Sequence, residues 1–182
     1  MLRQVDSRYE SLLNLTQHYD RVTCMARDRL TGRRVVLKTG SLPAARQELR
    51  ALMAIPPGVG PAVLDAVWTC EQRLVLVLEE LQGGTLLEAA KEIPPHQLPE
   101  LVRSICQCLG HLHRVGFIHT DLKPANIFLL NHGDGLSVRL LDFGFALSRI
   151  ADPWDVEEGK GGTKPYLAPE LIRGWGVDNQ AD

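Results

Sequence analysis

Residues 117–128 constrain this chain more than any other stretch, and they read Phe-Ile-His-Thr-Asp-Leu-Lys-Pro-Ala-Asn-Ile-Phe. Asp121 can accept a proton from a hydroxyl group, Lys123 can neutralise a phosphoryl group, and Asn126 can hold a hard cation through its carbonyl oxygen. Pro124 fixes one backbone φ angle between these side chains. Apolar residues stand on both sides, so we expect a polar loop held in a buried frame.

This stretch resembles the catalytic loop of protein kinases, whose pattern is His-Arg-Asp-Leu-x-x-x-x-Asn. Asp121, Leu122 and Asn126 match that pattern. Lys123 matches the lysine of serine/threonine kinases, whereas Thr120 replaces the arginine. The alternative interpretation is a polar connector between a helix and a strand, because such loops are common.

Two later motifs follow in the order that this family shows. Asp142-Phe143-Gly144 stands behind a short apolar run, and the aspartate is a natural magnesium ligand because hard cations prefer carboxylate oxygen. Residues 162–170 closely resemble the kinase segment that ends in Ala-Pro-Glu. The resemblance implies the following roles: catalytic residues Asp121, Lys123 and Thr163, and metal ligands Asn126 and Asp142.

Residues 5–38 alternate between apolar and polar side chains, which predicts strands, and Thr31-Gly32 marks a turn between two of them. Val36 and Lys38 then share one face of the second strand. A lysine at this place either guards an edge strand against aggregation or serves a cleft. Because the chain also carries the catalytic loop, we favour the second interpretation, in which Lys38 matches the lysine of the kinase motif Val-Ala-Ile-Lys and Val36 replaces the alanine.

Residues 41–55 predict a helix, with Pro43 in its first turn. Glu48 of this helix is the expected ion-pair partner of Lys38, and the pair would direct the lysine to the α- and β-phosphates of ATP. The alternative is a solvated glutamate on a helix surface. The kinase assignment requires that four residues converge on one cavity: Lys38, Asp121, Asn126 and Asp142.

Two further strands are expected at residues 61–68 and 74–79. The following run, Glu79-Glu80-Leu81-Gln82-Gly83-Gly84, resembles the hinge between kinase lobes, where backbone groups would contact adenine. Leu78 would guard the back of that pocket. Beyond the hinge we expect a short helix at 85–91 and a longer one at 99–113. The spacing of apolar residues in the longer helix predicts one buried face. This face would consist of Val102, Ile105, Leu109 and Leu112.

The resemblance therefore implies an α+β, kinase-like fold of two lobes. Residues 1–81 would form an antiparallel sheet with one helix, and residues 82–182 would form part of a mainly helical lobe. Asp182 falls where the family places the aspartate that opens its central helix. We therefore expect further sequence after Asp182 in the parent protein.

The segment that should cover the phosphates departs from the family pattern. Aligning Val22 with the valine of the glycine-rich loop puts Leu15, Gln17 and Asp20 where glycines are expected. Side chains there keep backbone N–H groups farther from phosphate, so we expect weaker nucleotide binding or slower turnover. The residues expected to contact or orient the nucleotide are Lys38, Glu48, Leu15, Val22, Val36, Leu78, Glu79 and Leu81.

Composition excludes some other functions. The formal net charge of −2 gives no general attraction to nucleic acid or anionic membranes. No run of 18 apolar residues predicts a membrane span, and the lack of a signal core favours the cytoplasm. The four cysteines form no paired Cys-x-x-Cys clusters, so we expect no zinc site.

The main hypothesis is a serine/threonine protein kinase that uses ATP and Mg²⁺ to phosphorylate a protein substrate. One alternative is a pseudokinase or ATP-binding scaffold, which the missing glycines motivate. Another is a small-molecule phosphotransferase of related fold, a class that usually lacks the segment ending in Ala-Pro-Glu.

Overall fold

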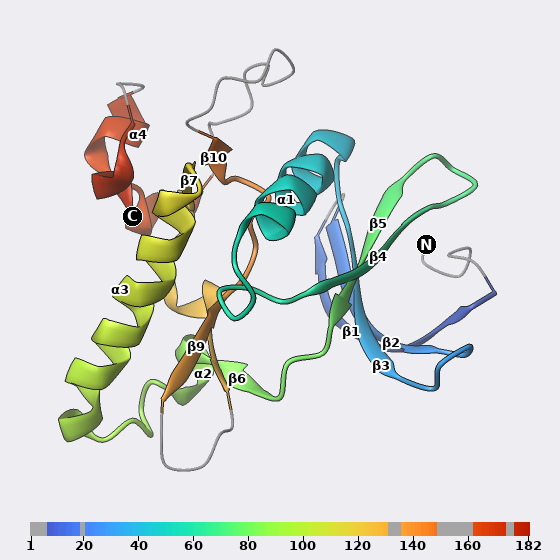
Figure 1. The fold of residues 1–182 in the computed structure, drawn as a ribbon, viewed down its shortest axis with the longest axis horizontal. Coiled ribbons are helices and arrows are strands. Elements are labelled where there is room, and N and C mark those ends of the chain that lie inside the picture. The colour runs from blue at the N-terminus through green and yellow to red at the C-terminus, as the bar shows by residue number, and fades with distance from the viewer. Residues whose placement is uncertain (1–6, 19–20, 131–135, 149–161, 174–176) are drawn as a thin grey trace.

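The computed structural model describes residues 7–18, 21–130, 136–148, 162–173 and 177–182. Asp20, which the alignment placed at a glycine position, lies outside the described residues. A five-stranded sheet with one long helix occupies one side of the molecule (Figure 1). Helix α3 and smaller sheets occupy the other side, as expected for the α+β fold.

The five-stranded antiparallel sheet has the order β1-β2-β3-β5-β4. Its strands are β1 (Tyr9–His18), β2 (Arg21–Asp28), β3 (Arg34–Thr39), β4 (Val63–Trp68) and β5 (Leu74–Glu79). The turn between β2 and β3 uses Gly32 with φ of 73°, a left-handed conformation that favours glycine. The predicted strands and the Thr31-Gly32 turn are confirmed.

Helix α1 (Leu42–Ala54) follows β3 and lies against one face of this sheet. The Ser41 side chain caps the helix by accepting a hydrogen bond from the Ala44 N–H, and Pro43 lies in the first turn. Its buried positions include Glu48 and Leu52, and Leu52 packs with Leu76 and Leu78 of β5. This face of the sheet is also the face that carries Lys38, because Lys38 pairs with Leu76.

Past β5, the chain enters a second group of elements. These are β6 (Gly83–Thr85), α2 (Leu86–Ala89), a 3-10 turn (Pro95–Gln97), α3 (Leu98–Arg114), β7 (Phe117–Ile118), a 3-10 turn (Pro124–Asn126), β8 (Ile127–Leu130) and β9 (Ser137–Leu140). β10 (Leu147–Ser148), a 3-10 turn (Lys164–Tyr166), α4 (Pro169–Arg173) and a last 3-10 turn (Asn179–Ala181) complete the described chain. The sheets here have the orders β6-β8-β9 and β10-β7.

The buried face of α3 differs from the predicted one at a single position. Val102 is 57% exposed, whereas Leu101, Cys108 and Leu112 are buried. One apolar stripe of this helix contains Val102, and the other contains Leu101 and Cys108. The second stripe packs on β9, because the Cys108 Sγ lies 3.6 Å from the carbonyl oxygen of Val138. The prediction for Val102 was therefore wrong.

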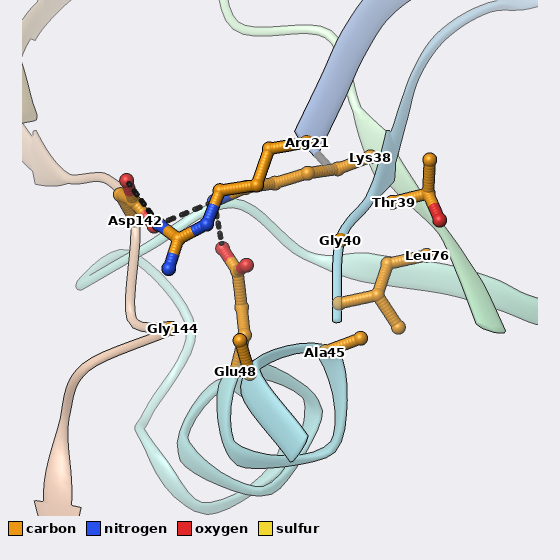
Figure 2. Close-up of a pocket in the computed structure, with 10 residues that line it drawn as sticks. Arg21, Lys38, Thr39, Gly40, Ala45, Glu48, Leu76, Asp142 and Gly144 are labelled. Atoms are coloured by element: carbon orange, nitrogen blue, oxygen red, sulfur yellow. Dashed lines mark hydrogen bonds and ion pairs between the residues drawn. The ribbon is translucent and has the colours of Figure 1, made fainter. Parts of the chain in front are cut away.

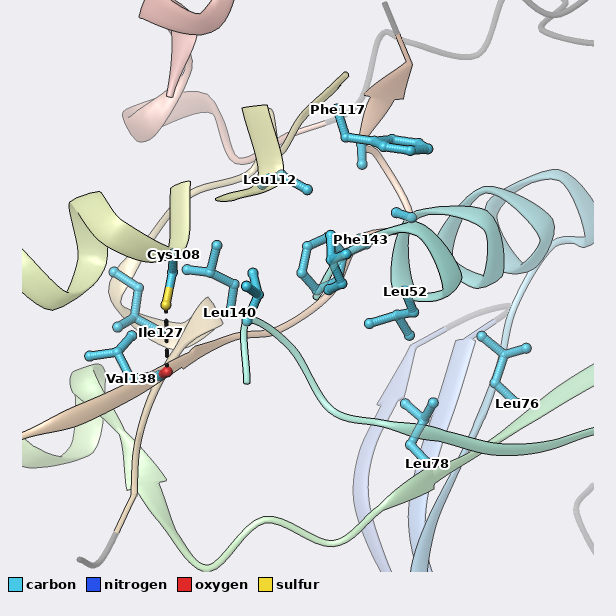
Figure 3. Close-up of a cluster of buried hydrophobic side chains, with 14 of the residues drawn as sticks. Leu52, Leu76, Leu78, Cys108, Leu112, Phe117, Ile127, Val138, Leu140 and Phe143 are labelled. Carbon is cyan, nitrogen blue, oxygen red and sulfur yellow. Dashed lines mark hydrogen bonds between the residues drawn. The ribbon is translucent and has the colours of Figure 1, made fainter. Parts of the chain in front are cut away.

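The main hydrophobic core joins the two sides of the molecule (Figure 3). Phe143 is fully buried between Leu52 of α1 and Leu140 of β9, and Leu112 of α3 belongs to the same cluster. A Cβ at Gly60 would lie 2.9 Å from the Phe143 ring, so the chain passes close to this aromatic residue. None of the helices in the described ranges has the length and apolar content needed to cross a membrane.

Candidate active site

Lys38 lies at the centre of a partly buried ionic cluster (Figure 2). Its Nζ is 2.6 Å from Oε1 of Glu48 on α1 and 2.9 Å from Oδ1 of Asp142. The Lys38 side chain is 16% exposed and that of Glu48 is 5% exposed, so solvent screens this contact weakly. The expected ion pair between Lys38 and Glu48 is present.

Opposing effects set the protonation states in this cluster. Burial would lower the pKa of Lys38, but the Glu48 and Asp142 carboxylates raise it above its ordinary value. Burial would also raise the pKa of Asp142, but Lys38 and then Arg21 lower it to about 2. Lys38 is therefore a cation and Asp142 an anion at neutral pH.

A second cluster forms around Asp121, a buried carboxylate. Thr163 Oγ1 donates to Asp121 Oδ1 at 2.7 Å, and Lys123 Nζ donates to Asp121 Oδ2 at 2.7 Å and to Thr163 Oγ1 at 2.6 Å. The Asn126 amide donates to the same carboxylate at 3.0 Å and to the Asp121 carbonyl at 2.8 Å. The three side chains predicted to be catalytic therefore contact one another in a closed triangle.

The Asp182 carboxylate anchors the backbone of the catalytic loop. It accepts hydrogen bonds from the N–H groups of His119 and Thr120, both at 2.7 Å, and lies 2.9 Å from Nε2 of His113. Thr120 has φ of 65°, an uncommon conformation for a residue with a side chain. Its hydroxyl donates to the carbonyl oxygen of Phe145 at 2.7 Å, so it links the loop to the segment after Asp142.

Backbone hydrogen bonds place the two clusters next to each other. The Leu141 N–H donates to the Asn126 carbonyl at 2.8 Å, which brings the following residue, Asp142, close to the Asn126 backbone. The pocket beside Lys38 is lined by Glu48 and Asp142 but not by Asp121 or Asn126. The expected convergence is therefore found as two adjoining clusters, not as one shared pocket.

The predicted metal ligands offer oxygen donors suited to Mg²⁺. Lys38 bonds Oδ1 of Asp142, which leaves the second carboxylate oxygen, Oδ2, for a metal. The side chain of Asn126 contacts Asp121 through its amide nitrogen, so its side-chain oxygen Oδ1 takes no part in those contacts. Within the described ranges, no group of three or more His, Cys, Asp and Glu is arranged to hold a metal. A magnesium ion here would need oxygen ligands from a phosphate as well as from these two residues.

The expected adenine contacts lie at the end of β5. Val36 pairs with Leu78 across β3 and β5, and both share the face of Lys38. The Glu79 carboxylate accepts a hydrogen bond from the Ala62 N–H at 2.8 Å, and the Glu79 N–H donates to the Ala62 carbonyl at 2.9 Å. The side chain and the N–H group of Glu79 are therefore both engaged with the residue before β4, and neither is available for the adenine contact that we expected.

The strand register corrects the prediction for Val22. Val22 pairs with Thr39, and Thr23 pairs with Lys38, so Val22 lies on the face opposite to Lys38. Leu15 stands at an irregular pairing in β1 and is 46% exposed, and Leu81 is half-buried beyond β5. Without glycines to mark the loop, the alignment at Val22 was one residue out of register.

Arg21 is a site residue that the sequence interpretation missed. It lines the pocket together with Lys38 and Asp142. Alternate residues of a strand share a face, so counting back along β2 from the Thr31-Gly32 turn places Arg21 and Thr23 on one face. Thr23 pairs with Lys38 of β3, so this is the face that carries Lys38. The turn was therefore a usable signal for this residue.

The buried ring of His119 makes a pH-dependent contribution to stability. Its Nδ1 accepts from the Asp121 N–H at 3.4 Å and its Nε2 lies 2.9 Å from the Leu141 carbonyl, an arrangement that suits the neutral ring. Burial lowers the pKa of His119, although Asp182 opposes this. The unfolded chain therefore binds this proton more readily than the folded chain does.

We expect the free energy of unfolding to fall as the pH drops below about 6.5. The contribution of His119 to this fall is at most ~1.4 kcal/mol per pH unit. The stabilising contribution is complete above that pH, because both states are then neutral. Thermal unfolding at pH 7 and pH 5 checks this for the chain and for His119→Gln, which can still donate to Leu141 but does not titrate. Equal losses of stability in the two proteins would contradict the assignment to His119.

Comparison with known proteins matches most of this chain to protein kinases. A family model described as the protein kinase domain matches residues 60–182. The chain is 38% identical over 112 residues to the serine/threonine-protein kinase PknB of Mycobacterium leprae, covering 59% of this chain and 17% of the relative. It is 31% identical over 161 residues to the death-associated protein kinase dapk-1 of Caenorhabditis elegans, covering 80% and 11%. Myosin light chain kinase A of Dictyostelium discoideum is 33% identical over 122 residues, covering 65% and 41%. The chain thus spans between 11% and 41% of the length of these relatives.

Proposed function

Because this chain belongs to the protein kinase domain family, we propose that it transfers the γ-phosphoryl group of ATP to a serine or threonine hydroxyl of a protein substrate. The triangle of Asp121, Lys123 and Thr163 carries this proposal. In the triangle a hydroxyl already donates to the carboxylate while a lysine contacts the hydroxyl oxygen. A substrate hydroxyl needs the same two neighbours when it loses its proton and attacks phosphorus.

In the proposed reaction, the substrate oxygen forms a bond to the γ-phosphorus as the bond to the β-γ bridging oxygen breaks and ADP leaves. Asp121 accepts the hydroxyl proton, and Lys123 neutralises charge on the transferred group. Thr163 holds the carboxylate and the ammonium in fixed positions. Phosphoryl transfer depends mainly on such positioning and electrostatic stabilisation.

Lys38 orients the nucleotide in this proposal. Glu48 keeps the ammonium group in place, and the ammonium donates to the α- and β-phosphates. Asn126 and Asp142 would hold Mg²⁺, which supplies positive charge to the β- and γ-phosphates when it is bound. Val36 and Leu78 would contact the adenine, together with backbone groups of the run from Glu79 to Leu81.

We also propose that the lobes of the kinase domain meet after Leu81. Residues 1–81 then contain the five-stranded sheet and α1, and residues 82–182 contain the catalytic loop and the segment to α4. The nucleotide would lie between the two lobes. The Thr120 hydroxyl bonds the Phe145 carbonyl directly, at the position where the family has an arginine.

We expect label from γ-labelled ATP to appear on serine or threonine of a generic acceptor protein such as casein, with Mg²⁺ present. The chain, and any longer natural form of it, is incubated with labelled ATP, and the labelled residues are identified after acid hydrolysis. Lys38→Met is the control, since it removes the phosphate contact and the partner of Glu48. Binding of Mg-ATP without transfer would favour an ATP-binding scaffold, and transfer to sugars or aminoglycosides alone would favour a small-molecule phosphotransferase.

A further inference from the structure

Arg21 places a second cation beside Lys38 and Asp142. It is the first residue of β2, and its side chain extends across the pocket toward Asp142 (Figure 2). The guanidinium lies 4.3 Å from the centroid of the Phe145 ring, and its Nη1 is 4.0 Å from Asp142 Oδ2. The side chain is 27% exposed, so it is open to solvent only in part.

Among the described residues, the contacts of Arg21 hold its stem without a hydrogen bond to its guanidinium group. A Cβ at position 40 would lie 3.3 Å from the Arg21 Cγ, so Gly40 leaves room for the arginine stem. The Phe145 ring supports the guanidinium from one side through a cation–π contact. The separation of 4.0 Å from Asp142 is too long for a hydrogen bond, so this ion pair does not saturate the guanidinium N–H groups.

Arg21 also adds positive charge to the pocket. Lys38 already contacts two acidic groups, Glu48 and Asp142. Arg21 places a second cation beside them, which favours the approach of a polyphosphate. A guanidinium is well suited to this position, because its planar set of N–H donors matches phosphate oxygens in pairs.

The strands that would cover the phosphates lack glycine. No glycine occurs before Gly32, and β1 and β2 remain paired up to His18 and Arg21. A backbone with side chains at every position approaches phosphate less closely than a glycine-rich one. A donor carried on a long side chain reaches farther than a backbone N–H group does.

We propose that Arg21 is a phosphate-binding residue of the nucleotide site, and that its guanidinium contacts the polyphosphate in place of glycine-loop backbone groups. This inference rests on the proposed function, since it takes ATP as the nucleotide. It also revises our expectation that the missing glycines weaken nucleotide binding, because Arg21 offsets part of that loss.

Calorimetric titration of the chain with Mg-ATP and with adenosine tests the proposal. We expect Arg21→Ala to weaken Mg-ATP binding by about tenfold or more, the effect of losing a hydrogen bond to a charged group. Adenosine binding should change less than about twofold, because adenosine has no phosphate for the arginine to contact. Arg21→Lys should retain part of the affinity for Mg-ATP, since it keeps the charge and loses the planar donor set.

Arg27→Ala is the matched control, because it removes the same charge from the same face of β2 at an exposed position. It should leave both affinities unchanged. An equal loss of ATP and adenosine binding in Arg21→Ala would show a structural role and overturn the proposal. Unchanged or tighter ATP binding would also overturn it, because Arg21 would then only block the pocket. Failure of the unaltered chain to bind Mg-ATP would overturn the proposed function itself.

Discussion

Replacing Asp121 with asparagine will reduce phosphoryl transfer by roughly 10²- to 10⁴-fold, the range typical for loss of a general base. Asparagine has nearly the same shape as aspartate, but its amide group accepts a substrate proton very poorly. Transfer of labelled phosphate to an acceptor protein measures the loss. Binding of Mg-ATP should change little, because Asp121 does not line the pocket that holds Lys38 and Asp142.

The cost to folding must be separated from the cost to catalysis. Asp121 is buried and accepts hydrogen bonds from Lys123, Asn126 and Thr163, so the variant leaves some of these donors without a partner. We expect a loss of stability of about 1–3 kcal/mol, which thermal unfolding can measure. Asp178→Asn is the control, since Asp178 is exposed and an asparagine can still cap the turn that it begins. Undiminished transfer by Asp121→Asn would refute the assignment of Asp121 as the base.

The parts of the site that could be predicted depend on short-range patterns. The catalytic loop contains Asp121, Lys123 and Asn126 within one turn-sized segment, so their spacing alone brings them together. The pair of Lys38 and Glu48 was also predictable, because a strand and the helix that follows it have well-defined faces. Each of these expectations combined local geometry with the resemblance to the kinase motifs.

The parts that were missed depend on contacts between distant segments. The exposed position of Val102 follows from how α3 packs on β9, and that packing cannot be read from helical spacing alone. The turn at Thr31-Gly32 gives the face of Arg21, but its neighbour Asp142 comes from the segment after β9, which no local pattern places there. The contact from Thr120 to Phe145 requires a left-handed backbone at Thr120, and no property of threonine predicts that conformation.

Replacing Gly83 with alanine will destabilise the fold by about 2–4 kcal/mol, through backbone strain together with a steric clash. Gly83 has φ of 148°, which side-chain-bearing residues rarely adopt, and a Cβ there would lie 1.9 Å from the carbonyl oxygen of Leu129. That oxygen belongs to the backbone of β8, so it cannot move without breaking the pairing of β6 with β8. Denaturant-induced unfolding measures the loss.

Two other glycines separate the causes of this effect. A Cβ at Gly84 would meet only the flexible end of Glu88, at 3.4 Å, so Gly84→Ala should change stability by less than about 1 kcal/mol. Gly32 has a positive φ of 73° with nothing within 4 Å of the added Cβ, so Gly32→Ala should show strain without a clash, about 1–2 kcal/mol. Because β8 directly follows the 3-10 turn at Pro124–Asn126, Gly83→Ala should also displace the catalytic loop and lower phosphoryl transfer. A Gly83→Ala protein as stable as Gly84→Ala would contradict the close approach of β6 to β8.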